Sequence, residues 1–382
     1  MKKLGLLPRL LIGIVIGILI GATKIEILTR LLMTFSGIFG EFLNYIIPLL
    51  IIAFVAPGIA ELGDKAGRLL GITAGLAYIS TVIAGTMAYL IATAVLPILV
   101  PSGANIGTGG IEISAIFTLQ IPPILPVMSA LITAFLLGLG MAAIKSTYMI
   151  HLMKEFEGII SKVIDHIIIP LLPIYIAGIF ANMAYTGEVM ATMSVFGKVF
   201  LLVIAMHILI IVIQFIIAGS ISSRNPFASI KNMLPAYFTA IGTQSSAATI
   251  PVTVASAKKN GVSDEVAEFA VPLCATIHLS GSTITITTCA LAVILIQGTT
   301  VGFGQIFPFV LMLGVTMVAA PGVPGGAIMA ALGLLSTMLG FTEAQLGLMM
   351  ALYIAQDSFG TACNVTGDAA IAMIVDRFAK KS

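Results

Sequence analysis

The chain has few charged residues and no tryptophan. Of its 382 residues only 9% are charged and 59% are hydrophobic, whereas about a quarter of the residues in a soluble domain are charged. A soluble core of this size could not bury so much apolar surface, so we expect an integral membrane protein. The net charge of +2 is too small to indicate a nucleic-acid partner.

Cysteine is also scarce, and its positions carry no recognisable chemistry. Cys274, Cys289 and Cys363 lie in apolar segments without a CxxC or Cys/His spacing. This pattern argues against a disulfide framework and against a Cys/His zinc site. No nucleophile–base pair accompanies the polar residues of the apolar segments, so we expect neither an enzyme nor a cofactor.

Lysine and arginine are absent between residues 261 and 376, yet the last apolar segment carries acidic residues. Asp357, Thr361, Asn364 and Asp368 follow the spacing i, i+4, i+7 and i+11. At about 100° per residue these four positions form one narrow stripe on a helix. A carboxylate inside a membrane normally needs a partner. Without a basic side chain nearby, that partner is a metal cation, a proton or a substrate ammonium, which points to a transporter.

The apolar segments and the basic residues between them predict the topology. Runs of spanning length occur near residues 6–23, 31–60, 68–100, 122–145, 159–185 and 194–218. Basic residues concentrate in cytoplasmic loops of membrane proteins. A cytoplasmic amino terminus places Arg68, Lys145 and Arg224 on the inner side, and the loop 101–120, which has no basic residue, on the outer side. We expect both termini to be cytoplasmic.

Two later apolar segments do not fit a simple crossing. Basic residues flank the run 233–257 on both sides, which predicts a re-entrant hairpin with its tip at residues 242–246. The run 303–340 is interrupted at residues 320–327 by two prolines and three glycines, which a continuous helix does not tolerate. We therefore expect an all-α integral membrane protein with about eight transmembrane helices and two re-entrant helical hairpins.

A weak internal repeat is consistent with this topology. The segment 45–54, with Pro48, is similar to the segment 167–176, with Pro170, and the two are predicted to cross in opposite directions. Inverted repeats combined with broken helices are typical of secondary transporters. The alternative is that isoleucine, proline and leucine recur here by chance.

Three polar motifs occur in a characteristic order: Gln244-Ser-Ser-Ala-Ala-Thr-Ile-Pro251, Gly322-Val-Pro-Gly-Gly, and Thr361-Ala-Cys-Asn-Val-Thr-Gly-Asp368. They resemble the two hairpin tips and the last helix of the dicarboxylate/amino acid:cation symporter family, the glutamate-transporter homologues. The resemblance covers nearly the whole chain and implies a homotrimer in the cell (plasma or inner) membrane. It also implies that residues 1–220 are mainly scaffold and oligomerisation helices, with the third and sixth spans partly in the moving domain. Residues 221–382 would form the transport core of two hairpins and the last two spans.

Two departures from the family pattern bear on the substrate. Members that carry acidic amino acids have an arginine directly before the threonine of the last helix, where this chain has Gly360. A second frequent arginine, beside the serines of the first hairpin, is here Gln244. A buried dicarboxylate without a guanidinium would lose its charge-assisted hydrogen bonds. The resemblance is therefore to the sodium:serine/threonine and neutral amino acid members.

The leading prediction is thus a symporter that imports a small neutral amino acid together with a cation, which we expect to be sodium. One alternative is a symporter of an acidic amino acid or a C4-dicarboxylate with an arginine supplied elsewhere. A channel or a transport-dead sensor is an alternative from a different class. A channel would need a continuous polar lining, whereas the polar residues of this chain cluster in one region.

The resemblance implies a substrate site formed by the hairpin tips, the broken seventh span and the last helix. Asp357 would bind the substrate ammonium, although a structural hydrogen bond to a neighbouring helix is the alternative. The implied set is Ser245, Ser246, Ser282, Val323, Ala327, Asp357, Gly360, Thr361 and Asn364.

The resemblance also implies sodium positions that use backbone carbonyls of the seventh span together with the last helix. The implied ligands are Cys274, Thr276, His278, Asn364 and Asp368. A further cation position normally uses an Asn-Met-Asp-Gly-Thr motif, which here reads His278-Leu-Ser-Gly-Ser282. Because this motif has lost its carboxylate, we do not expect a metal ion at the residual cation or proton site of Ser80, Thr81, His278 and Ser280. His278 is either a packing residue or a proton carrier.

Overall fold

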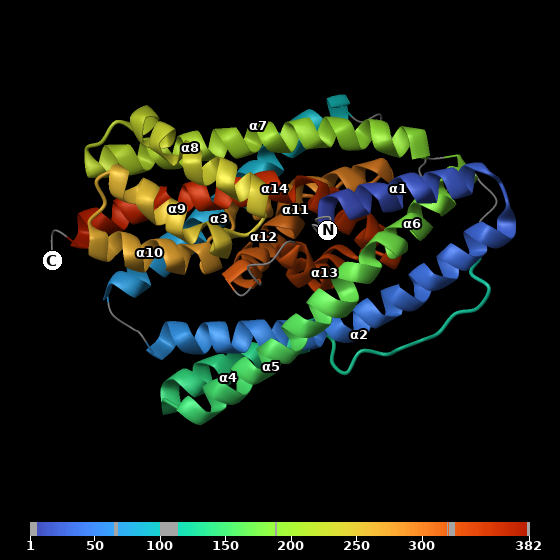
Figure 1. The fold of residues 1–382 in the computed structure, drawn as a ribbon, viewed down its shortest axis with the longest axis horizontal. Coiled ribbons are helices and arrows are strands. Elements are labelled where there is room, and N and C mark those ends of the chain that lie inside the picture. Colours follow the sequence, from blue (N-terminus) through green and yellow to red (C-terminus); the bar gives the residue numbers. More distant parts are fainter. Residues whose placement is uncertain are drawn as a thin grey trace, which may run out of the picture.

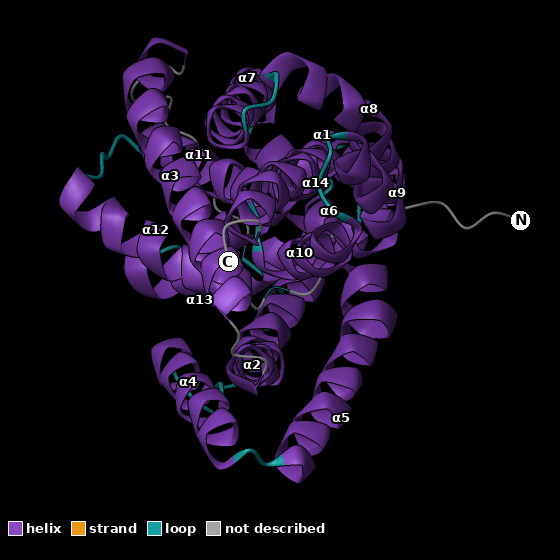
Figure 2. Ribbon diagram, turned by 90° about the vertical axis from the view of Figure 1, so that its left-hand side faces the viewer, coloured by secondary structure: helices purple, strands orange, loops and turns teal. Residues whose placement is uncertain are grey.

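The computed structural model describes residues 6–64, 68–99, 114–187, 189–318, 320 and 325–379, and helices account for every regular element in these ranges (Figure 2). The prediction of an all-α protein is therefore confirmed. The helices are α1 (Leu6–Ala22), α2 (Glu26–Asp64), α3 (Arg68–Leu99), α4 (Val127–Ile144), α5 (Thr147–Val163), the π-helical segment η1 (Ile164–Ile168), α6 (Ile169–Thr186), α7 (Val189–Ser222), α8 (Pro226–Thr243), α9 (Ser246–Lys259), α10 (Asp264–Ile277), α11 (Ser280–Ile296), α12 (Phe303–Val318), α13 (Gly326–Leu339) and α14 (Glu343–Ala379).

By length and composition, several helical stretches could cross a membrane. Six are long and apolar enough: Glu26–Ala60, Leu69–Leu99, Thr147–Thr186, Met193–Ser222, Asp264–Ile296 and Glu343–Ala379. Within the described residues, four shorter apolar helical stretches accompany them: Pro8–Ala22, Ile132–Ile144, Phe303–Val318 and Gly326–Leu339. The number of about eight crossings stays a prediction. The predicted span 159–185 is the later part of a longer helix. That helix begins at Thr147 and continues through η1 into α6. The π-helical segment η1 ends at Ile168, two residues before Pro170. Proline lacks an N–H donor, and a local widening of the helix accommodates this loss.

Helices α8 and α9 form a helical hairpin, with the turn at the predicted place. Asn225 caps α8 by accepting hydrogen bonds from the backbone N–H groups of Phe227 and Ala228 at 3.0 and 3.1 Å. The turn passes through Gln244, whose φ of +53° ends α8. Ser245 then caps α9 through its hydroxyl, which accepts from Ala248 N at 3.2 Å. At 1.5 Å per residue α8 and α9 are about 27 and 21 Å long, shorter than the ~30 Å hydrocarbon core.

The open base of this hairpin is attached to the ends of α7 and α14. Arg224 donates to the Asp376 carboxylate at 3.1 Å and to the carbonyl of Gly261. The other oxygen of Asp376 accepts from the N–H and the hydroxyl of Ser263 at 3.0 and 2.8 Å. The basic residues around the hairpin therefore lie at the same end of the molecule as the carboxyl end of α14, the left end in Figure 1. This common end is what a re-entrant hairpin requires, and re-entry itself stays a prediction.

Helices α12 and α13 contact one another and form the second hairpin. Its tip lies largely outside the described residues, and so does the predicted site residue Val323. The described part of the tip ends in Gly325, whose φ of +76° is in the left-handed region that favours glycine. This residue leads directly into the first turn of α13.

Helices α11 and α14 form the centre of the molecule, surrounded by α3, α7 and the α8–α10 group (Figure 1). Every residue of α11 is buried, and α14 is buried almost continuously from Leu346 to Asp376. On the outside, α2 and α6 pack against each other and run in opposite directions. These are the two helices that contain the weak repeat, and an inverted-repeat origin remains a prediction.

Candidate functional site

The helix that would form the seventh span is broken at His278 and Leu279, which separate α10 from α11 and have non-helical backbone angles. The first N–H groups of a helix have no partner within the helix. Here Asn364 of α14 supplies one, because its side-chain oxygen accepts from Gly281 N at 2.8 Å and from Ser282 N at 3.4 Å. Asn364, on the polar stripe of α14, therefore stabilises the break between α10 and α11.

Close packing joins the start of α11 to α14. A Cβ atom on Gly281 would lie 2.5 Å from the carbonyl oxygen of Gly360 and 2.7 Å from the Cβ of Cys363, so only glycine fits there. Ser282, one residue later, accepts hydrogen bonds from the Tyr353 hydroxyl at 2.9 Å and from the Asn364 amide at 3.1 Å. The start of α11 is therefore packed tightly against the middle of α14.

A small cavity lies where the first hairpin tip, the broken helix, the start of α13 and α14 meet. Its lining residues are Gln244, Ser246, Ala275, Leu279, Ser282, Ala320, Ala327, Tyr353, Asp357, Thr361 and Asn364. The cavity volume is about 20 Å³, which holds about one water molecule. The structure thus brings most of the predicted substrate residues to one cavity, which is too small in this conformation for an amino acid.

Asp357 supplies the negative charge of this cavity. Its carboxylate is buried and accepts a hydrogen bond from Gly325 N, at the second hairpin tip, at 2.7 Å. The side chains of Tyr353 and Thr361 also interact with it. Within the described part of the chain, no lysine or arginine lines the cavity. An uncompensated carboxylate in such surroundings favours a cationic ligand group.

Two predicted substrate residues that the structure describes, Ser245 and Gly360, do not belong to the cavity lining. Ser245 uses its hydroxyl to cap α9. A Cβ atom on Gly360 would face α11, at 3.7 Å from Ser282 N and 3.8 Å from the Thr285 hydroxyl. Val323 lies outside the described residues.

Tyr353, in contrast, lines the cavity although the sequence analysis did not select it. It lies one helical turn before Asp357 and therefore extends the same stripe toward the start of α14. That i−4 spacing is the signal that would have identified it.

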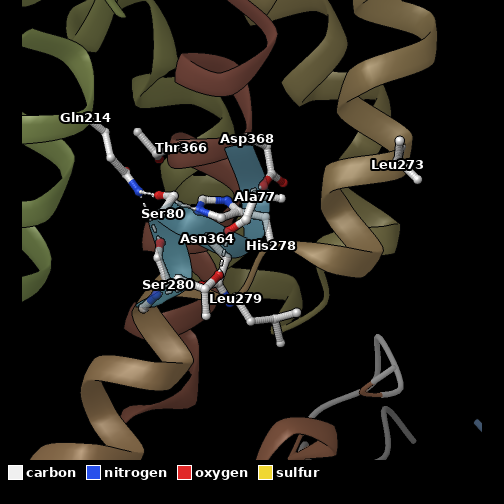
Figure 3. A network of polar contacts seen from close by, with 12 residues as sticks. Ala77, Ser80, Gln214, Leu273, His278, Leu279, Ser280, Asn364, Thr366 and Asp368 are labelled. Atoms are coloured by element: carbon white, nitrogen blue, oxygen red, sulfur yellow. Dashed lines mark hydrogen bonds and ion pairs between the residues drawn. The ribbon is translucent and has the colours of Figure 1, made fainter. Parts of the chain in front are cut away.

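A second polar cluster surrounds Asp368, as Figure 3 shows. One carboxylate oxygen of Asp368 is 2.9 Å from Nδ1 of His278, and both side chains are completely buried. The other oxygen, Oδ2, is buried and has no hydrogen-bond partner among the described residues. A buried acceptor in this state is unfavourable unless a cation or a water molecule occupies the site. Asp368 Oδ2 therefore fits the predicted sodium position.

The other implied sodium ligands already take part in hydrogen bonds of the protein. The Cys274 carbonyl accepts a helical hydrogen bond from His278 N at 2.8 Å, and the Asn364 amide oxygen is engaged by α11. Thr276 is exposed and its hydroxyl donates to Leu273 O at 2.7 Å. A carbonyl oxygen has two lone pairs, so its helical bond still leaves one for a cation.

The residues of the residual cation or proton site already have hydrogen-bond partners, partly outside the site. The Ser80 hydroxyl is 3.1 Å from Nε2 of His278 and accepts from the Gln214 amide at 2.9 Å. Thr81 donates to Ala77 O of its own helix at 2.9 Å. The Ser280 hydroxyl lies 3.3 Å from the Gln214 amide. Gln214, in α7, was missed by the sequence analysis, although a polar amide within an apolar span is itself a functional signal.

Comparisons with known proteins cover nearly the whole chain. The model of the sodium:dicarboxylate symporter family matches residues 6–378. The chain is 26% identical to the serine/threonine transporter SstT of Streptococcus agalactiae serotype III (strain NEM316) over 406 aligned positions, which cover 100% of this chain and 98% of that protein.

Two animal proteins match a shorter region. The chain is 28% identical to an excitatory amino acid transporter of Caenorhabditis elegans over 261 residues, 65% of this chain and 50% of that protein. It is 27% identical to excitatory amino acid transporter 2 of Mus musculus over 259 residues, 64% of this chain and 44% of that protein. The matches therefore span about half the length of these two transporters.

Proposed function

We propose, because the chain belongs to the sodium:dicarboxylate symporter family, that it imports a small neutral amino acid together with sodium by alternating access. A symporter family indicates a transporter and not an enzyme. The full-length similarity to a serine/threonine transporter favours a serine- or threonine-like substrate. By the same family membership, we propose a homotrimer in the plasma or inner membrane with both termini in the cytoplasm.

The observation that carries this proposal is the charge balance of the cavity. Asp357 matches the ammonium group of an amino acid. Helices α9, α11 and α13 all begin beside the cavity, where Ser246, Ser282 and Ala327 belong to the lining. Helix amino termini attract anions, so these three ends suit the α-carboxylate of the substrate.

An acidic side chain would bring a second carboxylate into the cavity. No arginine or lysine lies in the described lining to pair with it. The second carboxylate would then lose its hydration without a charge-assisted partner. This cost favours a neutral side chain over aspartate or a C4-dicarboxylate.

The small size of the cavity also suggests how the substrate enters. Gly325 N donates to Asp357 at 2.7 Å, so the second hairpin tip occupies a bonding position that a substrate ammonium would take. We propose that the α12–α13 hairpin moves away to admit the substrate. The domain with the two hairpins then moves relative to the scaffold helices, as in alternating access.

Sodium is proposed to bind at Asp368, where Oδ2 is buried and unpartnered. Oxygen ligands and a negative charge suit a hard cation. Asn364 connects the two sites, because its amide bonds to the start of α11 beside the substrate cavity and it lies one turn from Asp368 on the same stripe. Cation binding at Asp368 would therefore order Asn364 and the start of α11, which contact the substrate.

Uptake into proteoliposomes tests the proposal. A panel of radiolabelled amino acids and dicarboxylates is supplied with an inward sodium gradient or with choline in its place. We expect accumulation of serine or threonine above the external concentration, and only with sodium. Preference for aspartate or a dicarboxylate over every neutral amino acid would contradict the substrate, and uphill uptake without sodium would contradict the coupling ion. Equilibration without accumulation would favour a channel, and binding without uptake a sensor.

A further inference from the structure

Gln214 of α7 lies at the centre of a buried network that joins four parts of the fold. Its amide nitrogen donates to Ser80 Oγ of α3 at 2.9 Å and lies 3.3 Å from Ser280 Oγ at the start of α11. It also lies 3.5 Å from Nε2 of His278. Gln214 is only 8% exposed. A buried amide with this many polar neighbours is a structural constraint on all of them.

The imidazole of His278 is held at both nitrogen atoms. Nδ1 lies 2.9 Å from Asp368 Oδ1, and Nε2 lies 3.1 Å from Ser80 Oγ. Figure 3 shows the ring between Ser80 and Asp368, with Gln214 beyond Ser80. Gln214 therefore fixes the hydroxyl that in turn fixes the ring.

Helix α14 packs directly against the imidazole ring of His278. A Cβ atom on Gly367 would lie 2.7 Å from both Gln214 Oε1 and His278 Cε1. The chain avoids this clash with a glycine immediately before Asp368. The amide, the ring and α14 are thus in direct contact, and loss of the amide would leave the ring free on that side.

We propose that Gln214 is a positioning residue for the cation step. It holds His278 on one oxygen of Asp368, so that only Oδ2, the buried oxygen without a partner, remains for the cation. The inference rests on the proposed sodium coupling and adds a residue that acts on the cation through Ser80 and His278. Residues that orient a metal ligand from behind typically change metal affinity about 10- to 100-fold when they are substituted.

The test compares Gln214→Leu with Gln356→Leu in the full-length protein. Gln356 is a matched control because it is also a buried glutamine with an unpartnered Oε1, but its amide nitrogen contacts Cys289 Sγ and Leu352 O instead of the network. Thermal unfolding of the purified protein is followed while sodium replaces choline, without substrate. A second titration measures substrate affinity at saturating sodium.

We expect Gln214→Leu to weaken apparent sodium affinity about 10-fold or more, with substrate affinity at saturating sodium close to that of the wild type. Gln356→Leu is expected to leave the sodium affinity within about twofold of the wild type. A merely structural role of Gln214 would lower the melting temperature in both salts without moving the sodium midpoint, and that result would overturn the inference.

Ser80→Ala provides the same test from the other side of the hydrogen bond. It removes the hydroxyl that links Gln214 to His278, and it decides the question if Gln214→Leu does not fold. An unchanged sodium midpoint in Ser80→Ala would then overturn the inference. A wild-type protein whose stability and uptake do not respond to sodium would instead overturn the proposed coupling itself, so the two failures are distinguishable.

Discussion

The substitution Asp357→Asn tests the substrate site most directly. Asparagine has nearly the same shape as aspartate, so it can keep an oxygen that accepts from Gly325 N, now 2.7 Å away. It removes the negative charge from a cavity with no basic residue in its described lining. The change therefore addresses the interaction with the substrate ammonium and leaves the packing of α14 largely intact.

The expected magnitude follows from the burial of this carboxylate, which is 4% exposed. Removing one partner of a buried, hydrogen-bonded charge pair costs about 2–5 kcal/mol. At 1.4 kcal/mol for each tenfold change, this corresponds to a loss of about 30- to 4,000-fold in affinity. Because the bond to the Gly325 N–H competes with the ammonium, the loss should lie in the lower half of this range.

The assay is binding of radiolabelled serine or threonine to purified protein at saturating sodium, together with sodium-dependent thermal stabilisation without substrate. Asp376→Asn is the control, because Asp376 is also a buried carboxylate of α14 but pairs with Arg224 and Ser263 far from the cavity. We expect the control to lower stability and keep substrate affinity. If Asp357→Asn binds substrate within about threefold of the wild type, the assignment of Asp357 to the ammonium is wrong.

Three further substitutions or measurements follow from the site. Gly360→Arg should reduce serine or threonine uptake and allow aspartate binding. Its Cβ would lie 3.7 Å from the N of Ser282, a lining residue, and the arginine side chain is long enough to carry a guanidinium from there to the cavity; competition assays decide this, and wild-type preference for aspartate would refute it. Gly281→Ala should destabilise the protein by about 1–3 kcal/mol, because its Cβ would lie 2.5 Å from Gly360 O; an unchanged melting temperature would refute that. Reversal potentials should show sodium coupling with about one metal ion fewer per cycle than a protein that keeps the carboxylate at the residual cation site would carry. A pH gradient alone should drive no uptake; such uptake, abolished in His278→Asn, would contradict this.

Much of the candidate site follows from local sequence patterns. The helical period of 3.6 residues places Asp357, Thr361 and Asn364 on one face of α14, and all three line the cavity. The same period, extended by one turn, includes Tyr353. Gly360 lies only about 20° from Tyr353 around the helix at 100° per residue, so the helical period alone did not predict that Gly360 faces α11 while Tyr353 lines the cavity.

The amino-acid sequence by itself determined the membrane class, the all-helical fold and the turn of the first hairpin, because composition, periodicity and helix-breaking residues act locally. Its three polar motifs identified the family by resemblance. Only the tertiary structure decided that Ser80, Gln214, His278 and Asp368 share one network. These residues come from α3, α7, the α10–α11 break and α14, which are far apart in the chain. A helical period gives the direction of a side chain around its own axis, but which helices become neighbours depends on the packing of the whole molecule.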